Sequence, residues 1–346
     1  MYQVGLIGIG SIAEGYGKPE DPNSYCHIAG IIHNPQVELA AVADLSDERR
    51  DSFRTKWGAL LPPDYRSYAS AAEMLAAETL DIVAVCVRGP HHFAVMQEVL
   101  AAGPRAVFLE KPPTCSLAEM DEMTALAQTK GIPVMVSYSR HWAPHVLRLQ
   151  ELVAGGLIGE VQQVVGYCGH SFLSFASHTT DLICQFAGYC PSAVYARGHV
   201  PAADGPPGEV PAGYEPEPAL DTMTIEFENG IIGTQIGVGG EHGTFYCDVI
   251  GTEGLVRAGI YIPPFARTKE GPVDLAALGM PANASVFTVA YGQIADYLDG
   301  GPPAHCTDAD WVAVHEIGFA GIESVLTDQR VTLPNANRAR RIFANG

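Results

Sequence analysis

The chain has 346 residues, 47% hydrophobic and 17% charged, a composition typical of globular proteins and a length at which two domains are expected. Its 20 Lys and Arg against 39 Asp and Glu give a formal net charge of −19. That charge repels nucleic acids and anionic membranes, so we expect neither as a partner, and it favours a small neutral substrate. An apolar strand pattern follows Met1 directly and no run of 18 apolar residues occurs, so we expect a cytoplasmic protein without signal peptide or membrane span.

Residues 1–137 alternate strand and helix patterns. Strands are predicted over residues 4–9, 37–43, 81–87, 106–109 and 132–136, and helices over residues 46–57, 69–77, 92–102 and 116–130. Continuous apolar strands separated by helices predict a parallel sheet that is covered on both faces. With right-handed crossovers, this α/β pattern is a doubly wound Rossmann domain.

Residues 138–346 follow a different pattern. A helix is predicted over residues 144–154, and strands over residues 161–168, 193–198, 222–227, 231–238 and 246–251. The segment Glu228-Asn229-Gly230 between two of these strands is typical of a hairpin turn. Consecutive strands with few helices predict a second, α+β domain with a mostly antiparallel sheet. The Pro- and Gly-rich residues 201–218 predict a surface loop.

A glycine-rich turn follows the first predicted strand. Residues 8–13 (Gly-Ile-Gly-Ser-Ile-Ala) have the spacing of a dinucleotide-binding turn, with alanine in place of the third glycine. Gly8 allows the tight turn and Gly10 lets a diphosphate approach the backbone. Ser11 and Ile12 open the helix whose N-terminus would face that diphosphate. The pattern therefore predicts a dinucleotide site.

Asp44 ends the second predicted strand. A carboxylate at this place accepts hydrogen bonds from the adenosine ribose hydroxyls and repels the 2′-phosphate of NADP. We therefore favour NAD over NADP as the cofactor. Arg49 and Arg50 lie just downstream; we interpret them as a solvated helix face, and the alternative is a contact that favours NADP.

The distance between the glycine turn and Asp44 is unusual. Asp44 follows Gly10 by 34 residues, whereas about 20 is the usual spacing. The surplus indicates an insertion over residues 15–25 that interrupts the first helix. This insertion is either a tolerated surface loop or a flap near the bound cofactor or substrate.

Glu110 and Lys111 follow the strand predicted over residues 106–109. Ligands bind at the carboxyl end of the strands in such sheets, so a lysine at this place is expected to act on a ligand. Glu110 can hold its ammonium group, and Pro112 restricts the backbone behind it.

With the Glu-Lys-Pro triplet, the sequence resembles the glucose–fructose oxidoreductase / inositol dehydrogenase / MocA family, whose hallmark is this triplet at this place. The resemblance covers most of the chain. Its motifs, in chain order, are Gly8-x-Gly10, Asp44, Arg88–His92, Glu110-Lys111-Pro112, Tyr138–Pro144, Gly156–Val161, His178-x-x-Asp181 and Val249–Gly254.

The resemblance implies a Rossmann domain followed by a substrate domain on a large open-faced sheet. Such sheets often pair back to back, so a homodimer or homotetramer is expected. The cofactor would also contact Arg88, His92, Glu110 and Lys111, with the nicotinamide ring beside Lys111. The implied function is an NAD-dependent dehydrogenase or reductase that interconverts a secondary alcohol and a ketone of a neutral sugar, polyol or related carbohydrate.

The resemblance also assigns catalytic roles. His178 matches the family's catalytic histidine and would take the hydroxyl proton, while Lys111 would bind the reacting oxygen and stabilise alkoxide character. Asp181, three residues after His178, would orient a substrate hydroxyl or the histidine. Many polyol dehydrogenases of the family carry aspartate four residues before the histidine. Here that residue is Ser174, which can bond a hydroxyl but cannot fix His178 by charge.

Three further residues are expected to contact substrate: Arg140, His141 and Trp142, the last by stacking on an apolar ring face. We expect no metal ion, because Pro144 separates His141 from His145 and no His-Glu-x-x-His motif is present. The eight cysteines contain no Cys-x-x-Cys pair and are expected to be free thiols.

Two other functions stay open. One is an NAD-using hydrolase or lyase that oxidises a ring carbon transiently, cleaves a glycosidic bond and returns the hydride. The other is a dinucleotide sensor without catalytic activity, which would not need the proton-transferring pair Lys111 and His178.

Overall fold

The computed structural model describes residues 1–200, 210–237, 245–282 and 284–344. They form two compact units. Unit 1 consists of Met1–Thr114, Glu119–Trp142 and Asn283–Asp308, and unit 2 of Cys115–Ala118, Ala143–Ala282 and Ala309–Gly346. The sequence predicts one division, between residues 137 and 138, whereas the chain returns to unit 1 late through the segment Asn283–Asp308.

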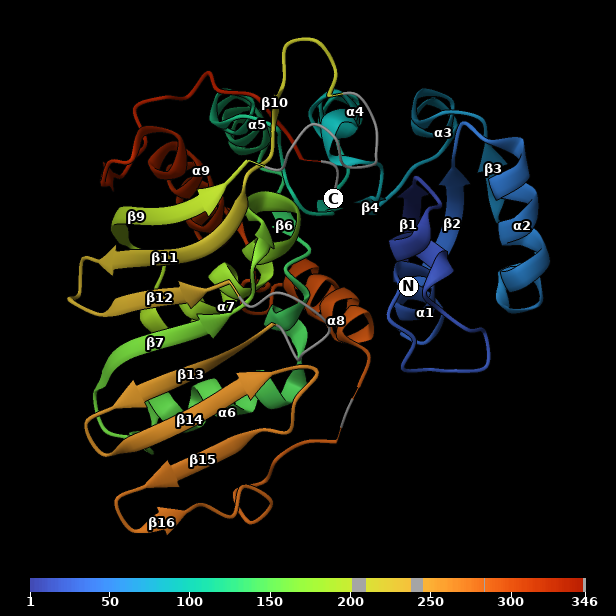
Figure 1. The fold of residues 1–346 in the computed structure, drawn as a ribbon. Coiled ribbons are helices and arrows are strands. Elements are labelled where there is room, and N and C mark those ends of the chain that lie inside the picture. Colours follow the sequence, from blue (N-terminus) through green and yellow to red (C-terminus); the bar gives the residue numbers. More distant parts are fainter. Residues whose placement is uncertain (201–209, 238–244, 283, 345–346) are drawn as a thin grey trace. The chain divides into compact units, whose positions relative to one another are not determined.

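Unit 1 is built on a six-stranded parallel sheet with the strand order β3-β2-β1-β4-β5-β6 (Figure 1). The strands are β1 (Tyr2–Ile7), β2 (Val37–Ala43), β3 (Arg66–Tyr68), β4 (Ile82–Val85), β5 (Ala106–Leu109) and β6 (Val134–Val136). This order confirms the predicted doubly wound Rossmann fold. The sequence does not predict β3, because its Arg-Ser-Tyr segment is polar and largely exposed.

The helices of unit 1 are α1 (His27–Ile32), α2 (Asp47–Trp57), α3 (Ala71–Ala77), α4 (Gly89–Ala102), α5 (Leu117–Lys130, from Glu119 on) and α8 (Val286–Leu298). Helices α2 and α3 begin close to the predicted places because Ser46 and Ser70 cap them. Each serine hydroxyl accepts the backbone N–H three residues later, at 3.2 Å. The sequence predicts neither α1 as a separate helix nor α8.

The first helix is interrupted, as the sequence predicts. Ser11–Gly15 forms a single π-helical turn, η1, and the chain becomes helical again only at His27. Glu14 fixes the turn to α2, because its Oε2 accepts hydrogen bonds from Lys56 Nζ at 2.9 Å and Trp57 Nε1 at 3.1 Å. Residues 16–26 therefore connect two fixed points of unit 1.

Helix α8 packs closely on α1, which explains why the late segment belongs to unit 1. A Cβ atom on Gly30 would lie 2.5 Å from Phe287 Cβ, so this approach requires glycine. Asn34 Nδ2 also donates to the carbonyl oxygen of Thr288 at 2.9 Å. Neither contact is visible in a pattern of neighbouring residues.

Unit 2 contains a ten-stranded sheet with the order β16-β15-β14-β13-β7-β12-β11-β9-β17, and β8 pairs with β11. The strands are β7 (Val161–Tyr167), β8 (His170–Ser171), β9 (Pro191–His199), β11 (Ala219–Phe227), β12 (Ile232–Ile236), β13 (Tyr246–Gly251), β14 (Gly254–Gly259), β15 (Phe265–Thr268), β16 (Gly271–Pro272) and β17 (Val331–Thr332). Among the described strands of this sheet, only β7 and β12 pair in parallel. The mostly antiparallel sheet is thus confirmed, as is the hairpin turn at Glu228–Gly230 between β11 and β12.

The structure tests only part of the loop predicted over residues 201–218. Residues 201–209 lie outside the described residues. Within the remainder, β10 (Glu215–Pro216) pairs in parallel with β18 (Ile342–Phe343) as a separate two-stranded sheet.

Helices α6 (Pro144–Ala154), α7 (Ser177–Ala187) and α9 (Asp308–Thr327) pack on the ten-stranded sheet of unit 2 (Figure 1). Burial alternates along β7, β11 and β12, so the sheet has one covered and one open face. The open face carries Tyr167 stacked on Tyr246, with ring centroids 4.5 Å apart, and Arg257 bound to Asp248 by two hydrogen bonds of 2.6 and 2.7 Å. No helix within the described ranges is both long and apolar enough to cross a membrane.

Candidate functional site

The glycine turn lies between β1 and η1. Gly8 has φ +84°, and a Cβ atom there would lie 2.9 Å from the backbone carbon and oxygen of Cys86. Only glycine fits that place. A Cβ atom on Gly10, in contrast, would meet no atom of the described residues within 4 Å. Gly8 is thus needed for the turn itself, whereas Gly10 keeps an open surface at which a diphosphate can approach the backbone. Ser11 and Ile12 begin η1, which is shorter than the predicted helix.

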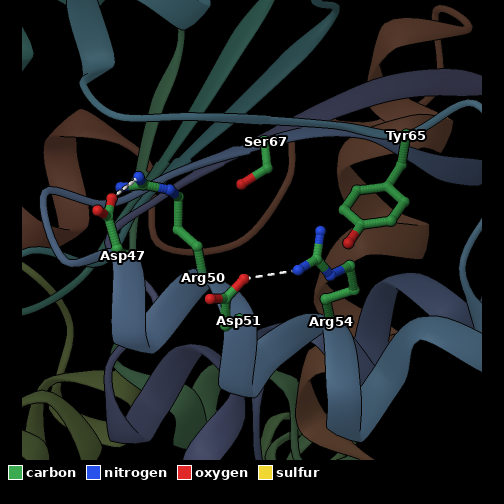
Figure 2. Close-up of a pocket in the computed structure, with 6 residues that line it drawn as sticks. All are labelled: Asp47, Arg50, Asp51, Arg54, Tyr65 and Ser67. Carbon is green, nitrogen blue, oxygen red and sulfur yellow. Dashed lines mark hydrogen bonds and ion pairs between the residues drawn. The ribbon is translucent and has the colours of Figure 1, made fainter.

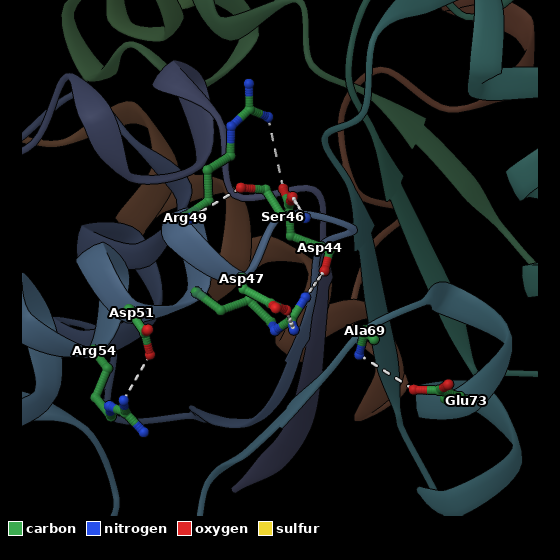
Figure 3. Close-up of polar contacts among 9 residues, drawn as sticks. Asp44, Ser46, Asp47, Arg49, Asp51, Arg54, Ala69 and Glu73 are labelled. Atoms are coloured by element: carbon green, nitrogen blue, oxygen red, sulfur yellow. Dashed lines mark hydrogen bonds and ion pairs between the residues drawn. The ribbon is translucent and has the colours of Figure 1, made fainter.

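Asp44 connects the glycine turn to the start of α2, and Figure 3 shows its contacts with Ser46 and Arg49. Its Oδ2 accepts the backbone N–H of Ile9 at 2.9 Å, and its Oδ1 accepts that of Ser46 at 2.9 Å. The carboxylate is 8% exposed, and Arg49 Nη1 lies 3.7 Å from Oδ2. The predicted ribose-binding residue therefore also connects β2 to the turn that follows β1.

Arg50 is not the solvated side chain that the sequence suggests. Its guanidinium donates to the carbonyl oxygen of Asp44 and to the carboxylate of Asp47, and it is 16% exposed. Arg49, by contrast, is 60% exposed. Of the two arginines, Arg49 is therefore the one with freedom to meet a 2′-phosphate.

A pocket of about 330 Å³ lies between α2 and the chain near β3, and is lined by Asp47, Arg50, Asp51, Arg54, Tyr65 and Ser67 (Figure 2). Its two arginines are each paired with an aspartate on the same helix. Ligand sites are usually apolar with a few converging polar groups. We therefore attribute no cofactor or substrate function to this charged surface pocket.

Glu110 and Lys111 lie at the carboxyl end of β5, as predicted. Glu110 is 5% exposed. Its Oε1 lies 3.0 Å from His27 Nε2, and its Oε2 accepts the backbone N–H of Lys111 at 3.2 Å. His27 Nδ1 lies in turn 2.9 Å from the hydroxyl of Tyr291. The sequence analysis misses His27 and Tyr291; the only local signal is that the interrupted helix resumes at His27.

The environment of Glu110 stabilises its charged form. Burial by itself would raise the pKa of this carboxyl group, but the hydrogen bond from His27, the charge of Lys111 and a hydrogen bond from Ser137 outweigh it and lower the pKa below its usual range. Glu110 is therefore an anion at neutral pH, close to the side chain of Lys111.

His92 lies inside unit 1, where it joins two loops. Its Nδ1 is 2.6 Å from the carbonyl oxygen of Pro112 and its Nε2 is 2.8 Å from that of Val87. Burial lowers its pKa, against the effect of both backbone contacts. Arg88 directly precedes α4 in one of these loops. Contacts of Arg88 and His92 with the cofactor stay predictions, and the position of His92 favours an indirect role that orients the Lys111–Pro112 segment.

Arg140, His141 and Trp142 form the short 3-10 helix η3 (Ser139–Trp142) after β6, and all three are nearly fully buried. Arg140 Nη1 donates to the hydroxyl of Ser139 at 3.0 Å. Trp142 packs edge-on against Phe108 with 5.2 Å between ring centroids. Their contacts with substrate stay predictions, and the packing of Trp142 favours a core role over stacking on a sugar.

Ser174, His178 and Asp181 belong to unit 2. The π-helical turn η4 (Phe172–Ala176) leads directly into α7, so Ser174 and His178 are one turn apart. Ser174 donates its hydroxyl to Glu217, which also accepts the backbone N–H of Ser174 at 2.9 Å. A carboxylate is therefore present beside Ser174 after all, although it comes from the Pro-rich segment and is missed by the sequence analysis.

Asp181 is fully buried. Its Oδ2 accepts a hydrogen bond from Gln185 Nε2 at 2.9 Å. The ring of His178 lies edge-on to Phe245, with centroids 5.6 Å apart. Lys111 belongs to unit 1 and His178 to unit 2, so their joint action on one substrate stays a prediction.

Comparison with known proteins identifies the class of unit 1. Residues 2–138 match the model of the GFO_IDH_MocA family, described as an oxidoreductase family with an NAD-binding Rossmann fold. The uncharacterized oxidoreductase YrbE of Bacillus subtilis is 26% identical over 246 residues, which are 65% of this chain and 64% of YrbE. D-apiose dehydrogenase of Paraburkholderia graminis is 30% identical over 123 residues, 36% of this chain and 31% of that enzyme. The matched region thus spans less than two thirds of each of these relatives.

The fold of the whole chain has solved counterparts. The aldose–aldose oxidoreductase from Caulobacter crescentus, crystallised with glycerol, has a TM-score of 0.77 at 18% identity, over 96% of this chain and 99% of that one. This similarity shows that both units share the architecture of that protein.

The two glycines allow a matched test of the turn. We expect Gly8→Ala to lower the thermal unfolding temperature by several degrees. The Cβ atom of the alanine would clash with the backbone of Cys86, and the alanine would have to adopt the positive φ of Gly8. Gly10→Ala should leave that temperature unchanged but weaken NAD binding at least about tenfold. Calorimetry and NAD titration measure both effects, and NAD affinity unchanged in Gly10→Ala would contradict its assigned contact with the diphosphate.

Proposed function

We propose that this chain belongs to the glucose–fructose oxidoreductase / inositol dehydrogenase / MocA family of oxidoreductases and is an NAD-dependent dehydrogenase or reductase of a sugar, polyol or related carbohydrate. The proposal rests on the position of Lys111 at the carboxyl end of β5 in an NAD-binding Rossmann domain. The backbone N–H of Lys111 donates there to the buried carboxylate of Glu110, which is an anion at neutral pH. A cation fixed at this edge of the sheet is suited to stabilising an alkoxide.

The residues of unit 1 fit a nicotinamide dinucleotide. Gly10 leaves open space where a diphosphate would approach, and the carboxylate of Asp44 lies directly after β2. When bound, the cofactor supplies a hydride acceptor. The chain's own residues do the remainder: Lys111 binds and polarises the reacting oxygen, and His178 takes the hydroxyl proton on one ring nitrogen.

We further propose NAD as the cofactor in preference to NADP. A 2′-phosphate near Asp44 would meet its negative charge. Two unit charges about 4 Å apart interact by roughly 1 kcal/mol in water and about 4 kcal/mol at an effective dielectric constant of 20. Arg49 partly offsets this repulsion, but its exposed position makes its contribution small.

The proposed substrate is a small neutral carbohydrate. The net charge of −19 disfavours polyanionic substrates. The names of D-apiose dehydrogenase and aldose–aldose oxidoreductase point to the same substrate class.

We also propose that the chain forms a homodimer or homotetramer through the open face of its ten-stranded sheet, which carries Tyr167, Tyr246 and Arg257. A monomer in analytical ultracentrifugation would refute this proposal.

A panel of neutral sugars, inositols and sugar acids, assayed at 340 nm with NAD and NADP, tests the function. The expected result is net NADH formation with at least one neutral member of the panel. Turnover of a glycoside without net NADH would favour the redox-neutral hydrolase or lyase. Dinucleotide binding without turnover of any compound would favour the sensor.

Lys111→Ala should lower kcat by at least about 100-fold, the order of one lost electrostatic donor at a transition state. NAD affinity should stay within a few-fold of wild type. Lys130→Ala, which removes an exposed lysine at the end of α5, is the matched control and should be fully active. Near-normal turnover of Lys111→Ala would disprove its role.

Asp44→Ala should reduce the preference for NAD over NADP in kcat/KM by about tenfold, which corresponds to 1.4 kcal/mol of removed repulsion. Asp47→Ala is the control: it removes a nearby carboxylate, which begins α2 and pairs with Arg50, but leaves Asp44 in place. An unchanged preference in Asp44→Ala would mean that another residue selects the cofactor.

A further inference from the structure

A chain of buried hydrogen bonds lies behind Lys111, and the reaction described above does not use it. It runs from the hydroxyl of Tyr291 on α8 to Nδ1 of His27 on α1, at 2.9 Å, and from Nε2 of His27 to Oε1 of Glu110, at 3.0 Å. The second carboxylate oxygen accepts the backbone N–H of Lys111. His27 and Tyr291 are 0% exposed, so water does not substitute for either partner.

The imidazole of His27 is held in one orientation by aromatic rings. It lies edge-on to Phe108, with centroids 4.9 Å apart, and tilted over Phe287 at 4.5 Å. These contacts come from β5 and α8, and the close packing of Gly30 against Phe287 fixes α1 between them. The ring therefore has no room to turn away from Glu110.

The partners determine which atom of His27 carries the proton. An ionised carboxylate only accepts hydrogen bonds, so Nε2 must donate to Glu110. The remaining nitrogen, Nδ1, then faces a phenol. Burial raises the pKa of Tyr291 well above its usual value, so the phenol keeps its proton and can donate it to Nδ1. Tyr291 thus donates a hydrogen bond to His27, and His27 donates one to Glu110.

We propose that His27, supported by Tyr291, is a positioning residue for Lys111. As the Nε2–H tautomer it holds Glu110 ionised beside the lysine. Glu110 in turn fixes the backbone of Lys111 and provides the negative charge that keeps its ammonium group in place. This proposal rests on the proposed catalytic role of Lys111. It also assigns a function to the interruption of the first helix. The segment 16–26 connects η1 to His27 and so allows His27 to lie beside Glu110 at the end of β5.

Three other titratable groups that interact electrostatically with members of this cluster, Cys26, Cys86 and His92, are uncharged at neutral pH. Burial raises the pKa of Cys26 to about 11 and that of Cys86 well above its usual value, and burial lowers the pKa of His92. The ionisation of Glu110 therefore does not depend on charge from these three groups.

The pKa of Glu110 determines the direction in which the pH profile of activity is expected to shift. The pKa of Glu110 is lowered in the folded protein, so the ionised form is present above that pKa and is lost as the pH falls through it. Without the donor from His27, the largest effect that lowers this pKa is lost, so burial raises the pKa of Glu110 relative to its value in wild type. Activity that needs the ionised form is then lost at a higher pH, so the acidic limb of the kcat/KM profile moves upward.

The closing experiment compares His27→Leu, His27→Gln and Tyr291→Phe with wild type. We expect His27→Leu to lower kcat/KM at pH 7 at least tenfold and to shift the acidic limb upward by about one pH unit. Glutamine keeps an N–H donor near the place of Nε2, so His27→Gln should recover much of both losses; Tyr291→Phe should have a smaller effect in the same direction. His33→Leu, at the end of the same helix, is the control and should retain the wild-type profile.

A second readout does not depend on activity. In ¹⁵N-labelled protein, the His27 imidazole should give the pattern of the Nε2–H tautomer, and Glu110→Gln should alter it. An Nδ1–H pattern, or activity loss in His27→Leu and His27→Gln with an unchanged pH profile, would overturn the proposal and leave only a structural role. If wild type reduces no NAD with any sugar, the proposed function fails, while the spectrum still decides whether His27 bonds Glu110 as assigned.

Discussion

A buried carboxylate must receive hydrogen bonds and a counter-charge. In unit 1, residues of α1 and α8 and the neighbouring Lys111 meet this requirement for Glu110. A carboxylate taken out of water without partners costs several kcal/mol. Glu110, at the carboxyl end of β5, is 5% exposed, yet this end of the sheet is also where a ligand is expected to bind. Glu110 is stable there because His27 and the backbone of Lys111 donate to it. Helix α1 supplies His27 to this arrangement, and Tyr291 comes from α8, in the late segment by which the chain returns to unit 1.

The long interval between Gly10 and Asp44 has a structural explanation in these terms. A continuous first helix would run from the glycine turn directly across the sheet. Instead the chain is fixed at Glu14 by Lys56 and Trp57, follows an irregular path, and becomes helical again at His27. Near the end of that path, the hydroxyl of Tyr25 bonds that of Ser139 in η3. The extra residues thus reach the ends of β5 and β6 rather than forming only a solvent-exposed loop. Whether they also move during turnover stays a prediction.

The parts of the fold that the sequence reveals are those decided by neighbouring residues. β2 and β5 are found with their bounds unchanged because they are continuous apolar runs, and the glycine turn and Asp44 are found from spacing. β3 is missed because an edge strand needs no apolar residues. His27, Tyr291 and Glu217 are missed for another reason: their partners lie 83, 264 and 43 residues away along the chain. Periodicity reports which face of an element is buried, but it does not report which distant side chain shares that face.

Asp44 illustrates how a residue can be assigned correctly from sequence and still have a second function. The carboxylate that is expected to face the ribose also holds the backbone of Ile9 in the glycine turn. Removing it should therefore disturb the diphosphate site as well as the ribose site, and both dinucleotides would lose affinity through the first effect. Only the second effect distinguishes NAD from NADP, because only NADP carries the 2′-phosphate. The ratio of the two kcat/KM values cancels the loss of order in the turn. It therefore reports what Asp44 does at the ribose, namely the hydrogen bond to the 2′-hydroxyl of NAD and the repulsion of the 2′-phosphate of NADP, in a way that affinity for either cofactor alone does not.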